Sequence, residues 1–314
     1  EEAKEAALKI GEALRITGKV KRGLGTIRQD LNVSIVEGTR VEIKGVQELE
    51  LIDEYVKREA QRQHALLEVK KELKEKMLSK ESIHAQTPEN VTQAFRQSAS
   101  KLIQNALQKK HVVMAMRLPF MKGIMGKEVQ PNRRVGTEIS SYVKVKANGQ
   151  GLLHGDELPN YGISAEEVET ASQLVRAREA DSFVLTTGTE TACHETMRVI
   201  KERVSHLLEG VPPETRNALE DGNTEYSRPL PGAARMYPET DLAPIAITGE
   251  TLARVQKNLP TWAFERLALY KKWGLSDKLA NEMKLDNHAR FFEELARKGY
   301  NATTCAVLLL ETLT

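Results

Sequence analysis

Hydrophobic and polar positions follow three different patterns along the first part of the chain. Residues 1–17 carry apolar side chains at helical spacing, which predicts a helix. Residues 27–36 and 39–44 alternate apolar and polar positions on either side of a glycine-containing turn, which predicts a β-hairpin. From residue 46 to about residue 78, an apolar stripe recurs among Glu, Lys and Gln without any Gly or Pro, which predicts one long helix.

The hairpin pattern also predicts how its two strands pair. A strict two-residue turn would set Val33 opposite Glu42 and so mix apolar with charged side chains on one face. A three-residue loop, residues 36–38, instead sets Asn32 opposite Glu42 and leaves one apolar and one polar face. We therefore expect this loop, with Gly38 in the left-handed conformation.

The middle of the chain alternates strand-like and helical patterns, which is typical of an α/β or α+β unit. A polar linker, residues 79–88, separates it from the first part and marks a candidate domain boundary. The expected helices cover residues 88–110, 164–179 and 189–209. The expected strands cover residues 112–118, 138–145 and 182–187.

The last third of the chain contains two further kinds of segment. Residues 211–247 are rich in Pro and Gly, and such a long irregular stretch is usually functional or disordered. Its aromatic and arginine content argues against disorder. From residue 249 onward the pattern predicts short helices over residues 250–258, 260–273, 275–284, 286–298 and 301–313.

The composition is that of a globular protein with nearly balanced charge. The 314 residues include 46 Lys and Arg against 44 Asp and Glu, which gives a net charge of +2. This balance argues against a protein that coats nucleic acid through bulk charge, while leaving room for a local basic patch. The length suggests two or three domains. No apolar run reaches the roughly 18 residues that a membrane helix needs.

The two cysteines and the two ends of the chain add further expectations. Cys193 and Cys305 are too few for a disulfide framework or a four-cysteine zinc site, and they favour a reducing compartment. We therefore expect a cytoplasmic protein. The chain begins at Glu1 and ends inside an apolar helical pattern, so we interpret it as an internal segment of a longer polypeptide.

The polar face of the hairpin is the first candidate site. It gathers acidic, amide and basic side chains, namely Asp30, Asn32, Arg40, Glu42 and Lys44. Carboxylates beside a lysine and an arginine suit the handling of Mg²⁺ and phosphate. The alternative is a half-buried sheet with a solvated face, which is the more common meaning of such a pattern.

The arginine- and proline-rich segment is the second candidate site. Arg235, Tyr237, Glu239 and Asp241 alternate there in a stretch framed by prolines. An arginine clamps a phosphate or carboxylate, and acids hold a metal or an amine. The alternative is an ordered connection that Tyr237 docks on the fold. The pair Lys271-Lys272 beside an aromatic residue is a weak nucleic-acid signal.

Several of these segments together resemble the B/E subunit family of tRNA-dependent amidotransferases. Residues 25–63 are similar to one long motif of the family, and Tyr237-Pro-Glu-Thr-Asp-Leu242 is similar to its Pro-Glu-x-Asp-Leu motif. Ala289-Arg-Phe-Phe-Glu-Glu-Leu295 resembles part of its helical domain. Between the motifs, Leu153-His-Gly-Asp-Glu-Leu-Pro-Asn-Tyr-Gly-Ile-Ser164 resembles the insertion domain of bacterial-type aspartyl-tRNA synthetases, which points to the archaeal E branch.

The resemblance implies an α+β protein built from three kinds of domain. They are part of a cradle-like α/β kinase domain, an inserted aspartyl-tRNA-synthetase-like α/β domain and an all-α helical domain. Residues 1–80 would be the C-terminal part of the cradle and residues 81–215 the insertion. Residues 216–248 would return to the cradle, and residues 249–314 would form a truncated helical domain.

The resemblance also implies a reaction, cofactors and partners. The family converts mischarged Glu-tRNA(Gln) to Gln-tRNA(Gln), so the protein would be a carbon–nitrogen ligase within a heteromeric complex. With ATP and Mg²⁺ it would phosphorylate the γ-carboxylate of the attached glutamate. Ammonia from a partner glutaminase-type amidohydrolase, the D subunit of the amidotransferase, would then displace the phosphate. No membrane is involved.

The resemblance assigns candidate roles to particular residues. Asp30 and Glu42 match acidic positions of the cradle, and Glu239 and Asp241 match its second acidic motif. These four are candidate catalytic residues, and Asp30 and Glu42 are also candidate metal ligands. The candidate phosphate or substrate contacts are Lys44, Arg40 and Arg235, and the candidate tRNA contacts are Lys271 and Lys272.

The family's cradle begins before Glu1, and its metal-binding histidine and glutamates have no counterpart here. Its C-terminal tail domain is also missing, so we expect this chain to be inactive or nearly so by itself. The first alternative is a binding module for tRNA and a partner, without catalysis. The second is a docking role through an exposed apolar patch on residues 90–210. A distance between Glu42 and Asp241 above about 20 Å would exclude one shared metal or phosphate site.

Overall fold

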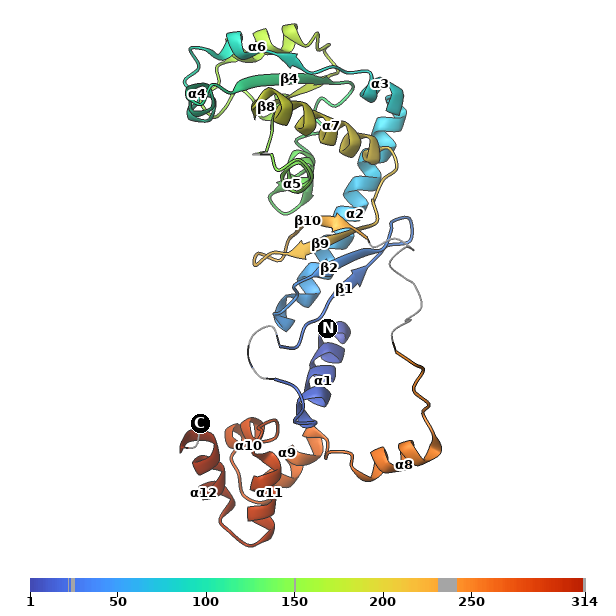
Figure 1. Ribbon diagram of the computed structural model, residues 1–314, viewed down its shortest axis with the longest axis vertical. Coiled ribbons are helices and arrows are strands. Elements are labelled where there is room, and N and C mark those ends of the chain that lie inside the picture. The colour runs from blue at the N-terminus through green and yellow to red at the C-terminus, as the bar shows by residue number, and fades with distance from the viewer. Residues whose placement is uncertain (22, 24–25, 150, 231–241, 313–314) are drawn as a thin grey trace. The chain divides into compact units, whose positions relative to one another are not determined.

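The computed structural model describes all residues except 22, 24–25, 150, 231–241 and 313–314 (Figure 1). Helices and small sheets are combined in it, as expected of an α+β protein. The chain divides into two compact units. The helical unit contains residues 1–29, 47–50 and the described part of 232–314. The mixed unit contains residues 30–46 and the described part of 51–231.

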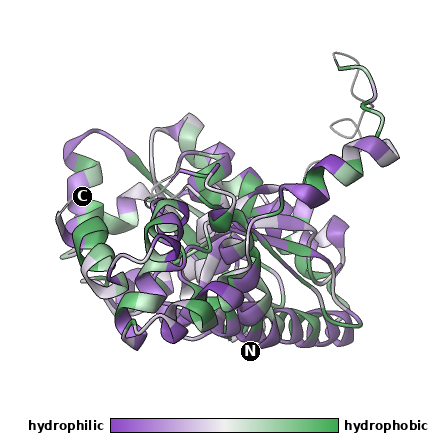
Figure 2. Ribbon diagram, turned by 90° about the horizontal axis from the view of Figure 1, so that it is seen from below, coloured by the Kyte–Doolittle hydropathy of each residue, from purple (hydrophilic) through white to green (hydrophobic). Residues whose placement is uncertain are grey.

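The helical unit packs short helices around aromatic side chains. Its helices are α1 (Glu2–Ile16), α8 (Gly249–Lys257), α9 (Ala263–Lys272), α10 (Asp277–Met283), α11 (Ala289–Arg297) and α12 (Ala302–Val307), followed by a π-helical turn (Leu308–Thr312). Tyr270 and Phe292 are fully buried, with ring centroids 4.9 Å apart. Hydrophobic and hydrophilic residues alternate along these ribbons (Figure 2). The helices predicted at both ends of the chain are therefore confirmed.

The first sheet of the mixed unit has the strand order β1-β2-β9-β10. Its strands are β1 (Leu31–Val33), β2 (Val41–Lys44), β9 (Glu214–Ala218) and β10 (Thr224–Pro229). β2 and β9 run parallel, and the two outer pairs are antiparallel. The long helix α2 (Ile52–Glu75) follows the short 3₁₀ helix Leu49–Leu51, which confirms the predicted long helix with a later start.

The second sheet of the mixed unit has the strand order β3-β4-β8-β7 and is antiparallel throughout. Its strands are β3 (Glu89–Asn90), β4 (Val112–Leu118), β7 (Leu153–His154) and β8 (Ser182–Gly188). One face packs against α4 (Lys101–Gln108) and α6 (Ala165–Leu174). The other face packs against α5 (Val135–Lys146) and α7 (Glu190–Leu207). Figure 1 shows α6 and α7 on opposite sides of β4 and β8.

Short elements complete the mixed unit. They are the helix α3 (Lys80–His84), the small sheet of β5 (Glu128–Gln130) and β6 (Arg133–Arg134), and the 3₁₀ helices Thr92–Phe95 and Gly155–Glu157. The N-cap predicted for α6 is confirmed, because the Ser164 hydroxyl accepts the backbone N–H of Glu167. None of the helices in the described part of the chain has the length and apolarity to cross a bilayer.

Two secondary-structure predictions in the mixed unit are wrong. Residues 138–145 form helix rather than strand, because Val135, Ile139 and Tyr142 are buried at helical spacing on one face of α5. Residues 88–110 are helical only at their end. β3 pairs at the edge of β4 instead, with Glu89 opposite Ala115, and a 3₁₀ helix follows it.

The segment from residue 211 to residue 247 also differs from the prediction. Its first part is a hairpin of β9 and β10 rather than an irregular stretch. The turn between these strands contains Asp221-Gly222, a dipeptide that favours hairpins.

The predicted pairing of β1 with β2 is confirmed, with two corrections. Asn32 lies opposite Glu42 as expected. The ladder ends at Val33 opposite Val41, so the connection is longer than residues 36–38. Gly38 does not have a positive φ, so the expected left-handed conformation is wrong. The neighbouring helix α2 explains the glycine instead, as described below.

Candidate functional site

One face of the first sheet collects polar side chains from all four strands. Cross-strand neighbours share a face, and the register aligns Asn32, Glu42, Thr215 and Arg228 in one row. The opposite face carries Val33, Val41 and Ile43, which are buried. We call the group formed by Asp30, Asn32, Glu42, Lys44, Thr215 and Arg228 the polar face.

Three of the predicted site residues meet on the polar face. The Lys44 Nζ atom lies 3.0 Å from Oδ2 of Asp30 and 3.7 Å from Oε2 of Glu42. All three side chains are partly exposed, by 28% for Lys44, 34% for Asp30 and 22% for Glu42, so a ligand in solution can reach them. Arg40, in the connection before β2, is exposed.

Thr215, which is fully buried in β9, was not predicted from the sequence. Its hydroxyl donates a hydrogen bond to Oε2 of Glu42 at 2.9 Å. Because the hairpin of β9 and β10 was not predicted, Arg228 was missed as well. It lies opposite Thr215 on β10 and is exposed. The Asp-Gly turn between two alternating stretches was the signal that could have revealed both residues.

The remaining predicted residues fall into two groups. Arg235, Glu239 and Asp241 fall outside the described residues, and with them the distance from Glu42 to Asp241. Lys271 and Lys272 are exposed on α9 in the helical unit. Lys271 pairs with Asp277 at 2.6 Å, whereas Lys272 has no ion pair among the described residues.

The helix α2 holds the connection between β1 and β2 through one buried amide. The Gln63 Nε2 atom donates to the carbonyl of Val33 at 3.3 Å. The Gln63 Oε1 atom accepts the backbone N–H groups of Thr39, at 3.3 Å, and Ile35, at 3.4 Å. The amide side chain of Gln63 therefore fixes both ends of the loop that precedes Glu42.

A buried group of charged residues lies on the other side of the first sheet. It contains Glu59 and Arg62 of α2, Glu138 of α5, Arg203 of α7, and Glu214 and Arg216 of β9, each at most 1% exposed. We call these six residues the buried ion cluster. Apart from Arg203, oppositely charged members touch closely, as burial of charge requires. The guanidinium of Arg216 lies 2.6 Å from Glu138, and that of Arg62 lies 2.9 Å from Glu59.

Two of the buried carboxyls that face Arg216, those of Glu138 and Glu214, have opposite pKa shifts. Burial by itself raises the pKa of Glu138, but the charges of Arg216 and Arg62 outweigh it and lower this pKa to about 2. Burial raises the pKa of Glu214 to about 7, although Arg216 and Arg62 oppose the rise. Glu214 also accepts a hydrogen bond from the Tyr142 hydroxyl. The cluster therefore keeps Glu138 ionised and lets Glu214 titrate near neutral pH.

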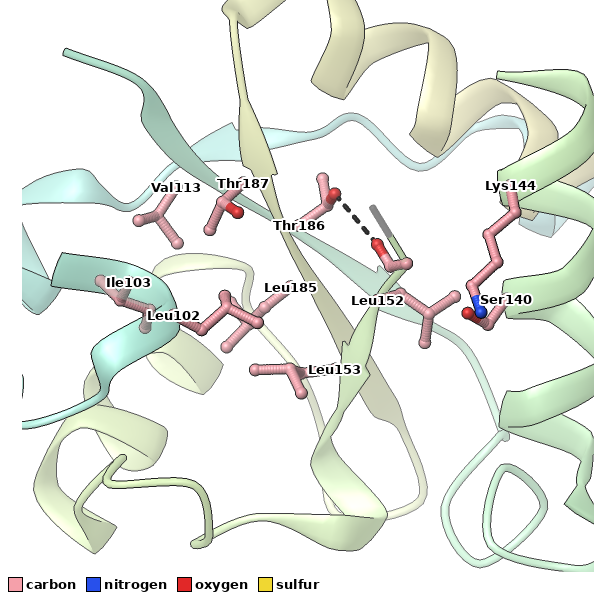
Figure 3. Close-up of a pocket in the computed structure, with 11 residues that line it drawn as sticks. Leu102, Ile103, Val113, Ser140, Lys144, Leu152, Leu153, Leu185, Thr186 and Thr187 are labelled. Atoms are coloured by element: carbon pink, nitrogen blue, oxygen red, sulfur yellow. Dashed lines mark hydrogen bonds between the residues drawn. The ribbon is translucent and has the colours of Figure 1, made fainter. Parts of the chain in front are cut away.

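At least three pockets adjoin the second sheet, and they differ in size and in charge. Figure 3 shows the first, a mostly apolar space of about 170 Å³ between α4, α5, β7 and β8. Ligand pockets usually measure about 300–1,000 Å³, so this one is too small for ATP. The second is larger, about 420 Å³, and its wall combines Glu128 and Glu157 with Arg134 and His154, so its charge is mixed.

The described residues contain no group of three or more His, Cys, Asp or Glu side chains that could hold a metal ion. Asp30 and Glu42 therefore offer at most part of a metal site. They are nevertheless carboxylates, the ligand type that Mg²⁺ prefers.

Comparisons with known proteins agree on one family. A family profile described as "GatB/GatE catalytic domain" matches residues 1–253. The chain is 48% identical over 316 aligned residues to the E subunit of glutamyl-tRNA(Gln) amidotransferase from Methanocaldococcus jannaschii, covering 99% of this chain and 49% of that protein. It is 46% identical over 314 residues to the same protein from Pyrococcus furiosus, covering 100% and 50%. The chain thus spans about half the length of the curated relatives it matches.

Proposed function

The chain belongs to the GatB/GatE catalytic domain family, and from this premise we propose that it is part of the E subunit of a glutamyl-tRNA(Gln) amidotransferase. The whole enzyme is then a ligase that converts Glu-tRNA(Gln) to Gln-tRNA(Gln). The structural observation that carries the proposal is the meeting of Asp30, Lys44 and Glu42 on the polar face. Paired carboxylates beside a cation suit phosphoryl transfer.

The proposed reaction has two steps. A γ-carboxylate oxygen of the tRNA-bound glutamate attacks the terminal phosphorus of ATP, ADP leaves, and an acyl phosphate forms. Ammonia then attacks the acyl carbon, inorganic phosphate leaves, and a proton is released as the amide forms. Both steps concentrate negative charge on phosphoryl oxygens, and cations placed beside these oxygens stabilise that charge.

In this proposal Asp30 and Glu42 provide carboxylate oxygens to Mg²⁺, with further ligands from outside the described residues. Bound there, Mg²⁺ supplies positive charge beside the transferring phosphoryl group. The Lys44 ammonium already pairs with both carboxylates. With such a cation held by the two carboxylates, the Lys44 ammonium would contact a phosphate oxygen instead. Arg40 is a second proposed anion contact.

The other assignments rest on the family resemblance. Glu239 and Asp241 are proposed as further catalytic acids and Arg235 as an anion contact. Lys271 and Lys272 are proposed to contact tRNA, and a glutaminase-type D subunit is proposed to supply ammonia in the cytoplasm. The domain division at residues 80, 215 and 248 is proposed on the same basis.

The test is ATP-dependent amidation of Glu-tRNA(Gln) with the D subunit supplied. We expect the full-length E subunit to be active and the 314-residue chain to be inactive or nearly so. In the full-length protein, Glu42→Gln should lower the rate by at least about 100-fold, because it removes a charge beside the transferring phosphoryl group. Glu37→Gln changes an exposed carboxylate in the β1–β2 connection and serves as the matched control.

Two outcomes would count against this proposal. If the Glu42→Gln enzyme were active, the polar face would have no part in the proposed reaction. Full-length protein that binds Glu-tRNA(Gln) but never consumes ATP would favour a binding module without catalysis.

A further inference from the structure

Thr215 engages one oxygen of Glu42 and leaves the other oxygen available. Its hydroxyl donates to Oε2 of Glu42 at 2.9 Å, and Lys44 approaches the same oxygen at 3.7 Å. Among the described residues, no hydrogen bond reaches Oε1 of Glu42. Because the Glu42 side chain is 22% exposed, this carboxylate can still reach a ligand above the sheet.

The position of Thr215 is fixed by its own strand. Glu42 and Thr215 are direct neighbours in the parallel ladder of β2 and β9. Thr215 has no exposed surface, so its hydroxyl is shielded from solvent. The hydrogen bond therefore joins two rigid elements, and this restricts the rotamers of Glu42.

The residue after Thr215 fixes β9 from the opposite face. Neighbouring residues on a strand point to opposite faces, so Arg216 enters the buried ion cluster. Its guanidinium contacts Glu138 of α5 at 2.6 Å and donates to the Thr224 carbonyl of β10 at 2.9 Å. β9 is therefore held by α5 and by β10, and Thr215 cannot shift without breaking these contacts.

We propose that Thr215 is a positioning residue for Glu42, holding Oε2 so that Oε1 faces a divalent cation on the polar face. This inference rests on the proposed function, in which Glu42 is a ligand of Mg²⁺. Hydrogen-bond partners of metal-ligating carboxylates orient those ligands, and their loss lowers metal affinity by about 10–100-fold.

The experiment compares Thr215→Val with Thr215→Ser in the full-length E subunit bound to the D subunit. Thr215→Val keeps the shape and removes the hydroxyl, whereas Thr215→Ser keeps the hydroxyl. Two quantities are measured, the Mg²⁺ concentration for half-maximal amidation and the dissociation constant of Mn²⁺ by electron paramagnetic resonance without substrate. We expect Thr215→Val to raise both by about tenfold or more, and Thr215→Ser to stay within about twofold of wild type.

Thr186→Val is the matched control, because Thr186 is a buried strand threonine of the second sheet in the same unit. It should leave both quantities unchanged. If Thr215→Val does not fold, Thr215→Cys replaces it, because a thiol is similar in size and only a weak donor. The expected result for Thr215→Cys is the same rise.

The outcomes separate this inference from the proposed function. The positioning role alone would be overturned by one pair of results. Thr215→Val, or Thr215→Cys in its place, would keep the wild-type Mn²⁺ affinity and Mg²⁺ requirement, while Glu42→Gln would be inactive. An equal rise in Thr186→Val would also overturn it, because the effect would then be structural. Full activity of Glu42→Gln would overturn the proposed function together with this inference.

Discussion

A Cβ atom on Gly38 would overlap the amide oxygen of Gln63. The same Cβ atom would also lie 2.8 Å from Cγ1 of Ile35. Glycine is thus required at this position by the close approach of α2, and not by the backbone conformation, since φ of Gly38 is not positive. Gly38 and Gln63 meet at the loop that leads into Glu42. The packing of this loop against α2 therefore helps to fix the position of Glu42 on the polar face.

Gly38→Ala should therefore destabilise the mixed unit by about 1–3 kcal/mol. The added methyl group pushes the Gln63 amide away from the backbone groups of Thr39 and Ile35 and leaves buried polar atoms unpaired. The free energy of unfolding in urea measures the loss. Gly126→Ala is the control, because a Cβ there meets only an ordinary contact at 3.7 Å. Equal stability of the two variants would contradict the explanation.

The buried ion cluster predicts different outcomes for two buried arginines. Arg216→Met leaves Glu138 and Glu214 without their closest cation and should cost about 3–5 kcal/mol. In Arg203, no guanidinium nitrogen has a hydrogen-bond partner among the described residues, and Glu138 is 4.0 Å away. Burial and the nearby Arg62 and Arg216 lower the pKa of Arg203 to about 10, despite Glu138.

Arg203→Met should therefore change the unfolding free energy by less than about 1 kcal/mol, since methionine keeps the contact with the Tyr142 ring without a buried charge. Urea denaturation of both variants at pH 7.5 measures the difference. Similar losses in the two variants would show that Arg203 has a stabilising partner.

The hairpin shows how much a local pattern can predict. The pairing of Asn32 with Glu42 followed from the sequence, because a slip of one residue would have turned charged side chains into the core. The length of the loop and the reason for Gly38 did not follow. Both depend on Gln63, whose contact with the loop exists only in the folded structure.

The missed elements have equally local causes. Ile139 and Val143 are four residues apart on the buried face of α5, but the run Tyr142-Val143-Lys144-Val145, rich in aromatic and β-branched residues, imitates a strand. In β9, Pro and Gly in the surrounding segment concealed a hairpin and with it Thr215. The buried ion cluster was beyond prediction, because its members come from α2, α5, α7 and β9.

The resemblance to the B/E subunit family is confirmed, and it identified the family, which the hydrophobic and polar patterns could not. Long motifs in fixed order are specific, so the family could be identified from residues 25–63 and the segment around Asp241. The roles of single residues within those motifs stay predictions.

Lys272 provides a test of the proposed tRNA contact. Lys271 is already paired with Asp277, so Lys272 is the better candidate to neutralise a phosphate. In the full-length E subunit bound to the D subunit, Lys272→Ala should weaken binding of Glu-tRNA(Gln) and reduce the slope of log K against log salt by about 1. Lys298→Ala changes an exposed lysine on the same unit and should alter neither quantity. An unchanged salt slope in Lys272→Ala would exclude the contact.

Glu214 should make the stability of the protein depend on pH in a way that its glutamine variant does not. The pKa of Glu214 is about 7 in the folded protein, raised mainly by burial, against 4.5 for a free glutamate. Between these values the folded state holds a proton that the unfolded state has lost, so stability falls as pH rises from about 4.5 to about 7 and is flat above. Glu138, with a pKa of about 2, changes stability only below pH 4.5.

Comparison with Glu214→Gln isolates this titration. The groups that face Glu214 include Arg216, Arg62, Glu138 and the hydroxyls of Tyr142 and Tyr226, and they remain in both proteins. Burial lowers the pKa of His154 and His206, which makes stability rise with pH, but equally in both proteins. Urea denaturation at pH 5, 6, 7 and 8 should show wild type losing stability relative to Glu214→Gln as pH increases. Parallel profiles would mean that Glu214 is already ionised at pH 5, and that its arginine partners outweigh its burial.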